Sequence, residues 1–339
     1  MTNELICAHS IHSMLSGEAD GNVKVLNANR MDGELQFLQQ KKFSSGFVTG
    51  LQWFPKDNGM FCVAYNNRVV IVDTNTFSIC ETHLFGQNQL FWCDWNELDG
   101  NLIAVAASAS TIRLIDVRSG GSLHNLTLSS PLGAKDHSVT RVLWDKTDCE
   151  ALFAGDSSGC IHVYDIRSTR KAIQILSPDN HLFLAITCLQ STPYGMSLIT
   201  SHGVHNFFTR WNFQSKSLVN SNVHFEMPAR RKGKDKKNTV SGLVRTQVFM
   251  TSDLLFSPVD QGAGDVLVHD LNTGARLRTL DSGVYTAAVG RKCNVVTGSK
   301  DQLPVLYSAG KCGIKVWSPK IDQDERHNPL HQDDWSDGE

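Results

Sequence analysis

A strand ending that recurs at a nearly constant interval limits the folds open to this chain. Seven short runs alternate between apolar and polar residues and stop at a small polar side chain. The residues just before these stops are 46, 43, 49, 47, 58 and 48 positions apart. Alternation predicts half-buried strands, and a period of roughly 40–50 residues is typical of small sheets repeated in an array. These reference residues are Leu26, Val72, Ile115, Tyr164, Trp211, His269 and Trp317.

A second landmark keeps step with the first. Trp53, Trp95 and Trp144 each end an apolar run and precede a polar turn and another strand. Each repeat then reads as three strands followed by an outer strand, and a sheet this small is stabilised by stacking on its neighbours around an axis. The sequence therefore predicts an all-β fold, a seven-bladed WD-repeat β-propeller over residues 1–319 that carries a flexible basic insertion at about 229–238.

The two ends of the chain predict an incomplete last blade. Only the segment MTNELICAHS precedes the second strand of the first repeat, which is enough for one innermost strand and leaves no upstream source for a closing strand. Residues 320–339 are acidic and contain Pro329, so they predict a disordered tail and not a strand. We expect a three-stranded last blade and reduced stability.

The polar stop itself has a structural explanation, but the residues after the stop differ between repeats. Asp116 and Asp165 are short polar residues that can hydrogen-bond the backbone of a tight turn. Two positions beyond the polar stop, arginine occurs in only two adjacent repeats, as Arg118 and Arg167. They are either solvated surface residues or a pair of forked donors for the carboxylates or carbonyls of a partner.

The charge distribution limits the kinds of partner that this chain can bind. A net charge of −2 argues against strong nonspecific binding of nucleic acid, which depends on many contacts between basic residues and phosphates. The exception is the basic insertion, which three interpretations fit: a solvated loop, a nuclear-import signal, or a direct nucleic-acid contact. Its basic residues are Arg230, Arg231, Lys232, Lys234, Lys236 and Lys237.

No site for catalysis, cofactor binding or membrane insertion can be assembled from the sequence. It has no phosphate loop and no His-Glu-x-x-His, and its nine cysteines include no Cys-x-x-Cys pair. Its apolar stretches fall well short of the roughly 20 residues that span a bilayer. We therefore expect a non-enzymatic protein without metal or cofactor, acting in a reducing compartment away from membranes.

The segment LFAGDSSGCIHVYDIR, residues 152–167, resembles a known docking box. WD-repeat substrate receptors use that box to attach to the large damaged-DNA-binding adaptor of cullin-4 ubiquitin ligases. The resemblance implies that Arg118 and Arg167 contact the adaptor, with Asp116, Asp165 and Tyr164 in the same box. Tyr164 and Ile115 stand where the box has tryptophan.

Within that group, the chain is similar to the Cockayne syndrome A family from about residue 11 to its end. The segments QWFPKDNGMF, DTNTF and the tail DDWSDGE carry this similarity. The resemblance implies a nuclear substrate receptor in transcription-coupled nucleotide excision repair, which works with repair proteins at stalled RNA polymerase. The family's helical segment before the propeller has no counterpart here, so we expect weaker adaptor binding. The alternative is a general WD-repeat interaction scaffold without a ligase.

Overall fold

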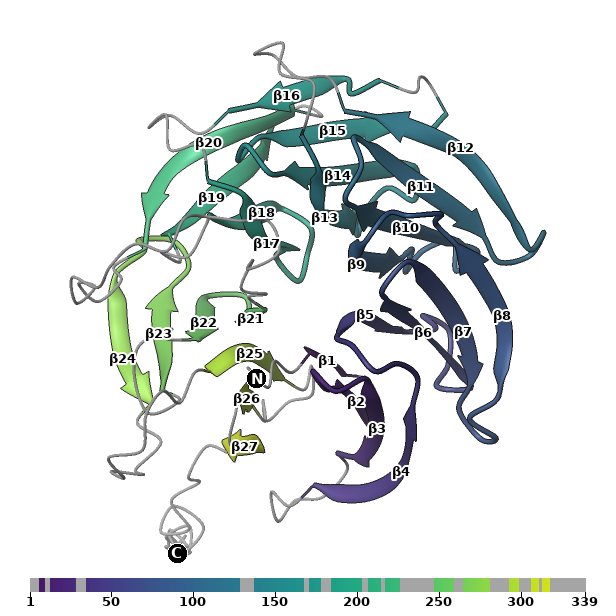
Figure 1. Ribbon diagram of the computed structural model, residues 1–339. Helices are drawn as coiled ribbons and strands as arrows, with labels where there is room; N and C mark the ends of the chain where they lie inside the picture. The colour runs from purple at the N-terminus through teal and green to yellow at the C-terminus, as the bar shows by residue number, and fades with distance from the viewer. Residues whose placement is uncertain are drawn as a thin grey trace, which may run out of the picture.

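The structure, a computed structural model, is a ring of small β-sheets (Figure 1). It describes residues 6–9, 13–28, 35–128, 137–167, 171–177, 184–202, 207–214, 217–225, 247–258, 265–280, 293–298, 306–310 and 313–317. Every regular element within these ranges is a strand, and none of them contains a helix able to span a membrane.

Six sheets have four antiparallel strands each, in sequence order from the inside of the ring to its rim (Figure 1). Blades 1 to 3 comprise β1 (Ile6–His9), β2 (Ser13–Gly17), β3 (Asn22–Asn27), β4 (Gln36–Lys42); β5 (Val48–Trp53), β6 (Met60–Tyr65), β7 (Arg68–Asp73), β8 (Ile79–Leu84); and β9 (Leu90–Trp95), β10 (Leu102–Ala107), β11 (Thr111–Asp116), β12 (Gly121–Thr127). Blades 4 to 6 comprise β13 (Val139–Trp144), β14 (Ala151–Asp156), β15 (Ile161–Asp165), β16 (Gln174–Leu176); β17 (Ile186–Ser191), β18 (Ser197–His202), β19 (Phe207–Gln214), β20 (Ser217–His224); and β21 (Phe249–Met250), β22 (Leu254–Pro258), β23 (Val266–Asp270), β24 (Arg276–Leu280).

A further sheet has three strands, β25 (Cys293–Gly298), β26 (Leu306–Gly310) and β27 (Gly313–Trp317). It lies between the sixth and first blades, because Tyr307 packs with Met14 and Leu306 packs with Val266. The prediction of seven blades is therefore met only in part, since six blades are complete in the described residues. β1 pairs with β2 as an innermost strand, as predicted, and β27 has no fourth strand beside it in the described ranges.

The repeat landmarks fall on equivalent places in the sheets. All seven reference residues lie on the third strand of their sheet, and Trp53, Trp95 and Trp144 end the innermost strands of blades 2, 3 and 4. These three indoles are buried. The sequence period therefore corresponds to one blade, as predicted.

The burial of the strands differs from the expected alternation. β10 is buried along its whole length, and the first four residues of β15 are buried. A blade stacks against a neighbour on each side, so both faces of its middle strands are covered. Exposure is concentrated on outer strands such as β4 and β24. Core clusters extend across blade boundaries, which makes the blades one packed unit.

Candidate docking face

Two sets of turns lie on the same side of the ring. In blades 2 to 6 the turn between the first and second strands contacts the turn that comes after the third strand. In blade 3 the Val117 amide donates to the Asn101 carbonyl (2.8 Å), and in blade 4 the Ile166 amide donates to the Glu150 carbonyl (2.9 Å). We call the surface formed by these turns in blades 2 to 5 the turn face.

Neighbouring turns also touch each other along this face. Lys56 Nζ donates to the Leu98 carbonyl (3.0 Å), which joins blades 2 and 3. Asn96 Nδ2 donates to the Cys149 carbonyl (2.7 Å), which joins blades 3 and 4. These bonds connect the turns of blades 2, 3 and 4, so this part of the turn face is one continuous surface.

Arg167 is presented on the turn face of blade 4. Its Nη2 and Nε lie 3.0 and 3.2 Å from the two carboxylate oxygens of Asp165, and its Nη1 pairs with Glu150. The bond to Asp165, with the nearby carboxylate charges, holds the pKa of Arg167 above its usual value. The side chain is nevertheless 61% exposed, so its fork is oriented but still accessible to a partner.

Arg118 occupies the equivalent position in blade 3. Its side chain is 77% exposed, and its Nη2 lies 3.7 Å from Asp116 Oδ2. Asp116 is buried and its Oδ1 accepts from the Arg118 amide (2.9 Å), just as Asp165 Oδ1 accepts from the Arg167 amide (3.0 Å). The two aspartates therefore form the tight turns predicted for them, and the structure brings both arginines to one face.

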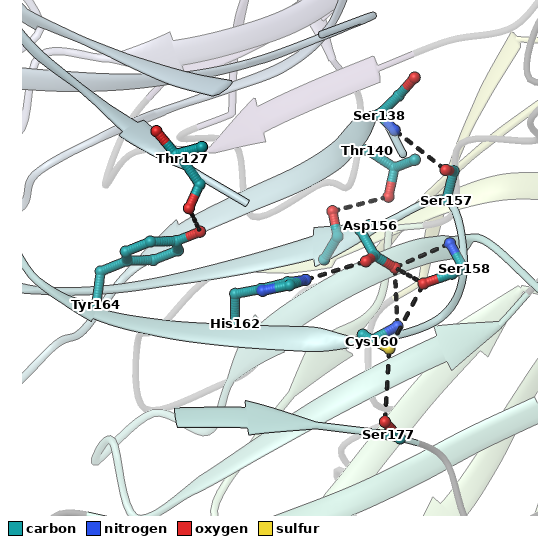
Figure 2. Close-up of polar contacts among 11 residues, drawn as sticks. Thr127, Ser138, Thr140, Asp156, Ser157, Ser158, Cys160, His162, Tyr164 and Ser177 are labelled. Carbon is teal, nitrogen blue, oxygen red and sulfur yellow. Dashed lines mark hydrogen bonds and ion pairs between the residues drawn. The ribbon is translucent and has the colours of Figure 1, made fainter. Parts of the chain in front are cut away.

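Tyr164, expected on the docking surface, is instead a core residue. Its side chain is fully buried, and its hydroxyl donates to the Thr127 carbonyl of β12 (3.1 Å) (Figure 2). Strand β15 is enclosed by the adjacent blades, so an aromatic side chain at this position packs between blades 3 and 4. Burial raises the pKa of Tyr164 above its usual value. Tyr164 thus links blade 4 to blade 3 and cannot itself contact a partner.

A buried polar network in blade 4 goes beyond the sequence-based expectations (Figure 2). Asp156 Oδ2 lies 3.0 Å from His162 Nε2, and Asp156 Oδ1 accepts from the Ser158 hydroxyl (2.7 Å) and from the Cys160 amide (2.9 Å). Burial alone would raise the pKa of Asp156, but the bonds from His162 and Ser158 outweigh it and the pKa is lowered. The spacing of aspartate, serine and histidine in GDSSGCIH is the only sequence signal for this network.

The network contains serine, histidine and aspartate but is not built for catalysis. The Ser158 hydroxyl donates to Asp156 and not to His162, so there is no nucleophile hydrogen-bonded to its base. All three side chains are also buried. The arrangement instead fixes the turn between β14 and β15. Thr140 adds a link to blade 5, because its hydroxyl donates to the Ile186 carbonyl (2.7 Å).

Asp94 connects the two arginine-bearing blades from within. Its Oδ2 accepts from the Trp144 amide (2.7 Å), and its carbonyl accepts from the Trp144 indole (3.2 Å). Burial raises the pKa of Asp94 to about 7, despite the bond from the Trp144 amide. This contact sets the position of blade 4 relative to blade 3.

We expect Asp94→Asn to stabilise the protein above neutral pH. The folded pKa of about 7 exceeds the ordinary value of 3.8, so the stability linked to protonation is present below pH 3.8 and lost as the pH rises through 7. Asparagine keeps an acceptor for the Trp144 amide without the charge. Because Asp94 is half-buried, we expect a gain of about 2 kcal/mol at pH 8 and almost none at pH 4. Urea unfolding at both pH values measures this, and a less stable variant at pH 8 would contradict it.

The basic insertion and the acidic tail lie outside the described residues. This applies to the tail at 320–339 and to all of the basic residues named for the insertion, Arg230, Arg231, Lys232, Lys234, Lys236 and Lys237. The three alternative roles of the insertion and the disorder expected for the tail stay predictions.

The fold and its repeat define a WD-type β-propeller, and comparisons with known proteins agree with this class. No family model matches the chain. A stretch of 146 residues is 27% identical to Radiation-sensitive protein 28 of Saccharomyces cerevisiae. The match covers 41% of this chain and only 28% of the length of that relative. The β-propeller domain of Cps50 (Swd1) from Myceliophteria thermophila superposes with a TM-score of 0.73 at 15% identity, covering 94% of this chain and 97% of that one. The latter likeness concerns the fold alone.

Proposed function

We propose that this chain is the substrate-recognition subunit of a cullin-4-type ubiquitin ligase and docks by its turn face on the large damaged-DNA-binding adaptor. One observation carries the proposal. Arg118 and Arg167 occupy equivalent positions on adjacent blades, and both guanidinium groups are exposed on the same face. The resemblance of residues 152–167 to the adaptor-docking box supports the same assignment.

The geometry suits recognition of carboxylates or carbonyls on a protein surface. A guanidinium offers several donors in a planar fork, and Asp165 and Glu150 hold that of Arg167 in place before any partner arrives. Two such forks on successive blades would fix the orientation of the propeller on the adaptor. Asp116 and Tyr164 act beneath the surface, as a turn former and as a link between blades.

The proposal extends to the cellular process. The similarity to the Cockayne syndrome A family favours a role in transcription-coupled nucleotide excision repair, in which the chain recruits proteins at stalled RNA polymerase. The match to a yeast relative named for radiation sensitivity fits a role in repair. In this role the chain is nuclear and non-catalytic, and other subunits perform the ubiquitin chemistry. We also propose that β25–β27 form the seventh blade.

Affinity purification followed by mass spectrometry, with and without ultraviolet irradiation, tests this function. We expect the adaptor in both samples, because docking does not depend on damage, and polymerase and repair proteins enriched after irradiation. Partners recovered reproducibly without the adaptor would instead identify a general interaction scaffold.

A further inference from the structure

A pair of apolar side chains stands out on the turn face of blade 5. Tyr194 and Met196 flank Gly195 in the turn between β17 and β18, and they are 73% and 71% exposed. They are the most exposed large apolar side chains in the part of the chain that the structure describes. Large apolar side chains exposed together on a soluble protein often mark an interaction site. We call these two residues the apolar pair.

This turn departs from its equivalents in the preceding blades. Strand pairing leaves seven residues between the matched strand ends in blades 2, 3 and 4 (54–60, 96–102 and 145–151) but six in blade 5 (192–197). In the three longer turns the fourth residue is an aspartate, namely Asp57, Asp99 or Asp148. The blade 5 turn has no aspartate and instead reads Thr-Pro-Tyr-Gly-Met-Ser. The turns of blades 2, 3 and 4 thus carry an acidic residue where the blade 5 turn carries apolar ones.

Hydrogen bonds within blade 5 fix this turn, and it lies close against the blade 4 turn. Gly195 has a φ of +69°, and its amide donates to the Thr192 carbonyl (2.9 Å). A Cβ at Gly195 would lie 2.7 Å from Thr147 Cγ2, so only glycine allows this close approach. The Met196 carbonyl accepts from the Phe213 amide (3.2 Å). A turn whose backbone is already fixed needs no further ordering on binding, which favours the use of its side chains as anchors.

The apolar pair continues the row of arginines. Thr147, which contacts Gly195, belongs to the same blade 4 turn as Glu150, and Glu150 pairs with Arg167. Arg118, Arg167 and the apolar pair therefore lie on the turn faces of three successive blades, 3, 4 and 5. A protein that covers Arg167 by pairing with its guanidinium would extend over the next turn with only a short further reach.

We propose that Tyr194 and Met196 are the apolar anchor of the surface that docks on the adaptor. This inference rests on the proposed function. The matching surface of the adaptor would present carboxylates or carbonyls to Arg118 and Arg167 and an apolar pocket opposite blade 5. Tyrosine is enriched among residues that dominate binding energy, and methionine adapts its flexible thioether to pockets of irregular shape. The arginines then orient the complex, while the apolar pair supplies the apolar surface that becomes buried against the adaptor.

The test compares affinities for the purified adaptor by biolayer interferometry. The double variant Tyr194→Ser/Met196→Ser is expected to bind at least about tenfold more weakly than the wild type. Tyr194→Phe keeps the apolar body and is expected to bind like the wild type. Leu277→Ser is the matched control, because Leu277 is a 58% exposed apolar residue on β24, on the rim of blade 6. Thermal unfolding checks that all variants fold, which we expect because both replaced side chains are exposed.

The outcomes separate this inference from the proposed function. If Arg167→Glu weakens binding and the double variant binds like the wild type, the apolar anchor is refuted and the ligase assignment stands. A loss in Tyr194→Phe equal to that of the double variant would also refute an apolar role. If the wild type itself does not bind the adaptor, both proposals fall.

Discussion

Replacing Asp156 by alanine is expected to lower the free energy of unfolding by about 3–5 kcal/mol. The carboxylate is buried and bonded to His162, Ser158 and the Cys160 amide. Its removal leaves buried donors without an acceptor and loosens the turn between β14 and β15. Urea unfolding followed by tryptophan fluorescence measures the effect.

The matched control is Asp57→Ala. Asp57 is also a turn aspartate, and its Oδ1 accepts from the Gly59 amide (2.7 Å), but it is exposed. We expect it to cost less than about 1 kcal/mol, because water can replace the lost bond. Equal losses in the two variants would show that the buried network does not stabilise blade 4.

The effect of Asp156→Ala should depend on pH in a defined direction. The folded pKa of Asp156 is lowered, so the stability that its charge contributes is present above the ordinary value of 3.8 and is lost as the pH falls through the folded pKa. The difference between wild type and variant should therefore be steady above about pH 5 and shrink below pH 3.8. A difference that grows on acidification would contradict this charge assignment.

Tyr164→Ala is expected to destabilise the propeller by about 3–5 kcal/mol, because it removes a large side chain from a fully enclosed position. Tyr164→Phe should cost only about 1 kcal/mol, since it loses the hydrogen bond to the Thr127 carbonyl and keeps the ring. Denaturant unfolding of both variants gives these values.

The same tyrosine variants distinguish a core role from a docking role. Tyr164→Phe, which stays folded, should bind partners as the wild type does, because the residue has no exposed surface. Impaired partner binding by a Tyr164→Phe protein of near-normal stability would show that Tyr164 does contribute to docking.

The strand order and the turn aspartates could be predicted because they depend on local chemistry. Alternation marks each third strand, and a short acidic side chain at its end accepts from a turn amide, as Asp116 and Asp165 do. A small polar residue ends the third strand of every repeat, so the period alone locates these turns.

Features that depend on contacts between blades could not be predicted. Asp94 and Trp144 are 50 positions apart in the sequence, and nothing in either segment indicates that they bond. The docking box places Tyr164 on the docking surface, because the box specifies only the position of this residue along its strand. It does not indicate that the neighbouring blades bury the side chain. The apolar pair is not evident in the sequence, because its significance lies in comparison with the turns of adjacent blades, which requires the strand register.

The affinity of the purified chain for the purified adaptor, measured for Arg167→Glu, tests the central claim most directly. Arg276→Glu on β24 is the matched control, since it makes the same charge change at an exposed arginine of blade 6. We predict at least about tenfold weaker binding by Arg167→Glu, because a carboxylate would replace the donor fork, and unchanged binding by Arg276→Glu. Wild-type affinity in a well-folded Arg167→Glu protein would contradict the assignment of the turn face as the docking surface.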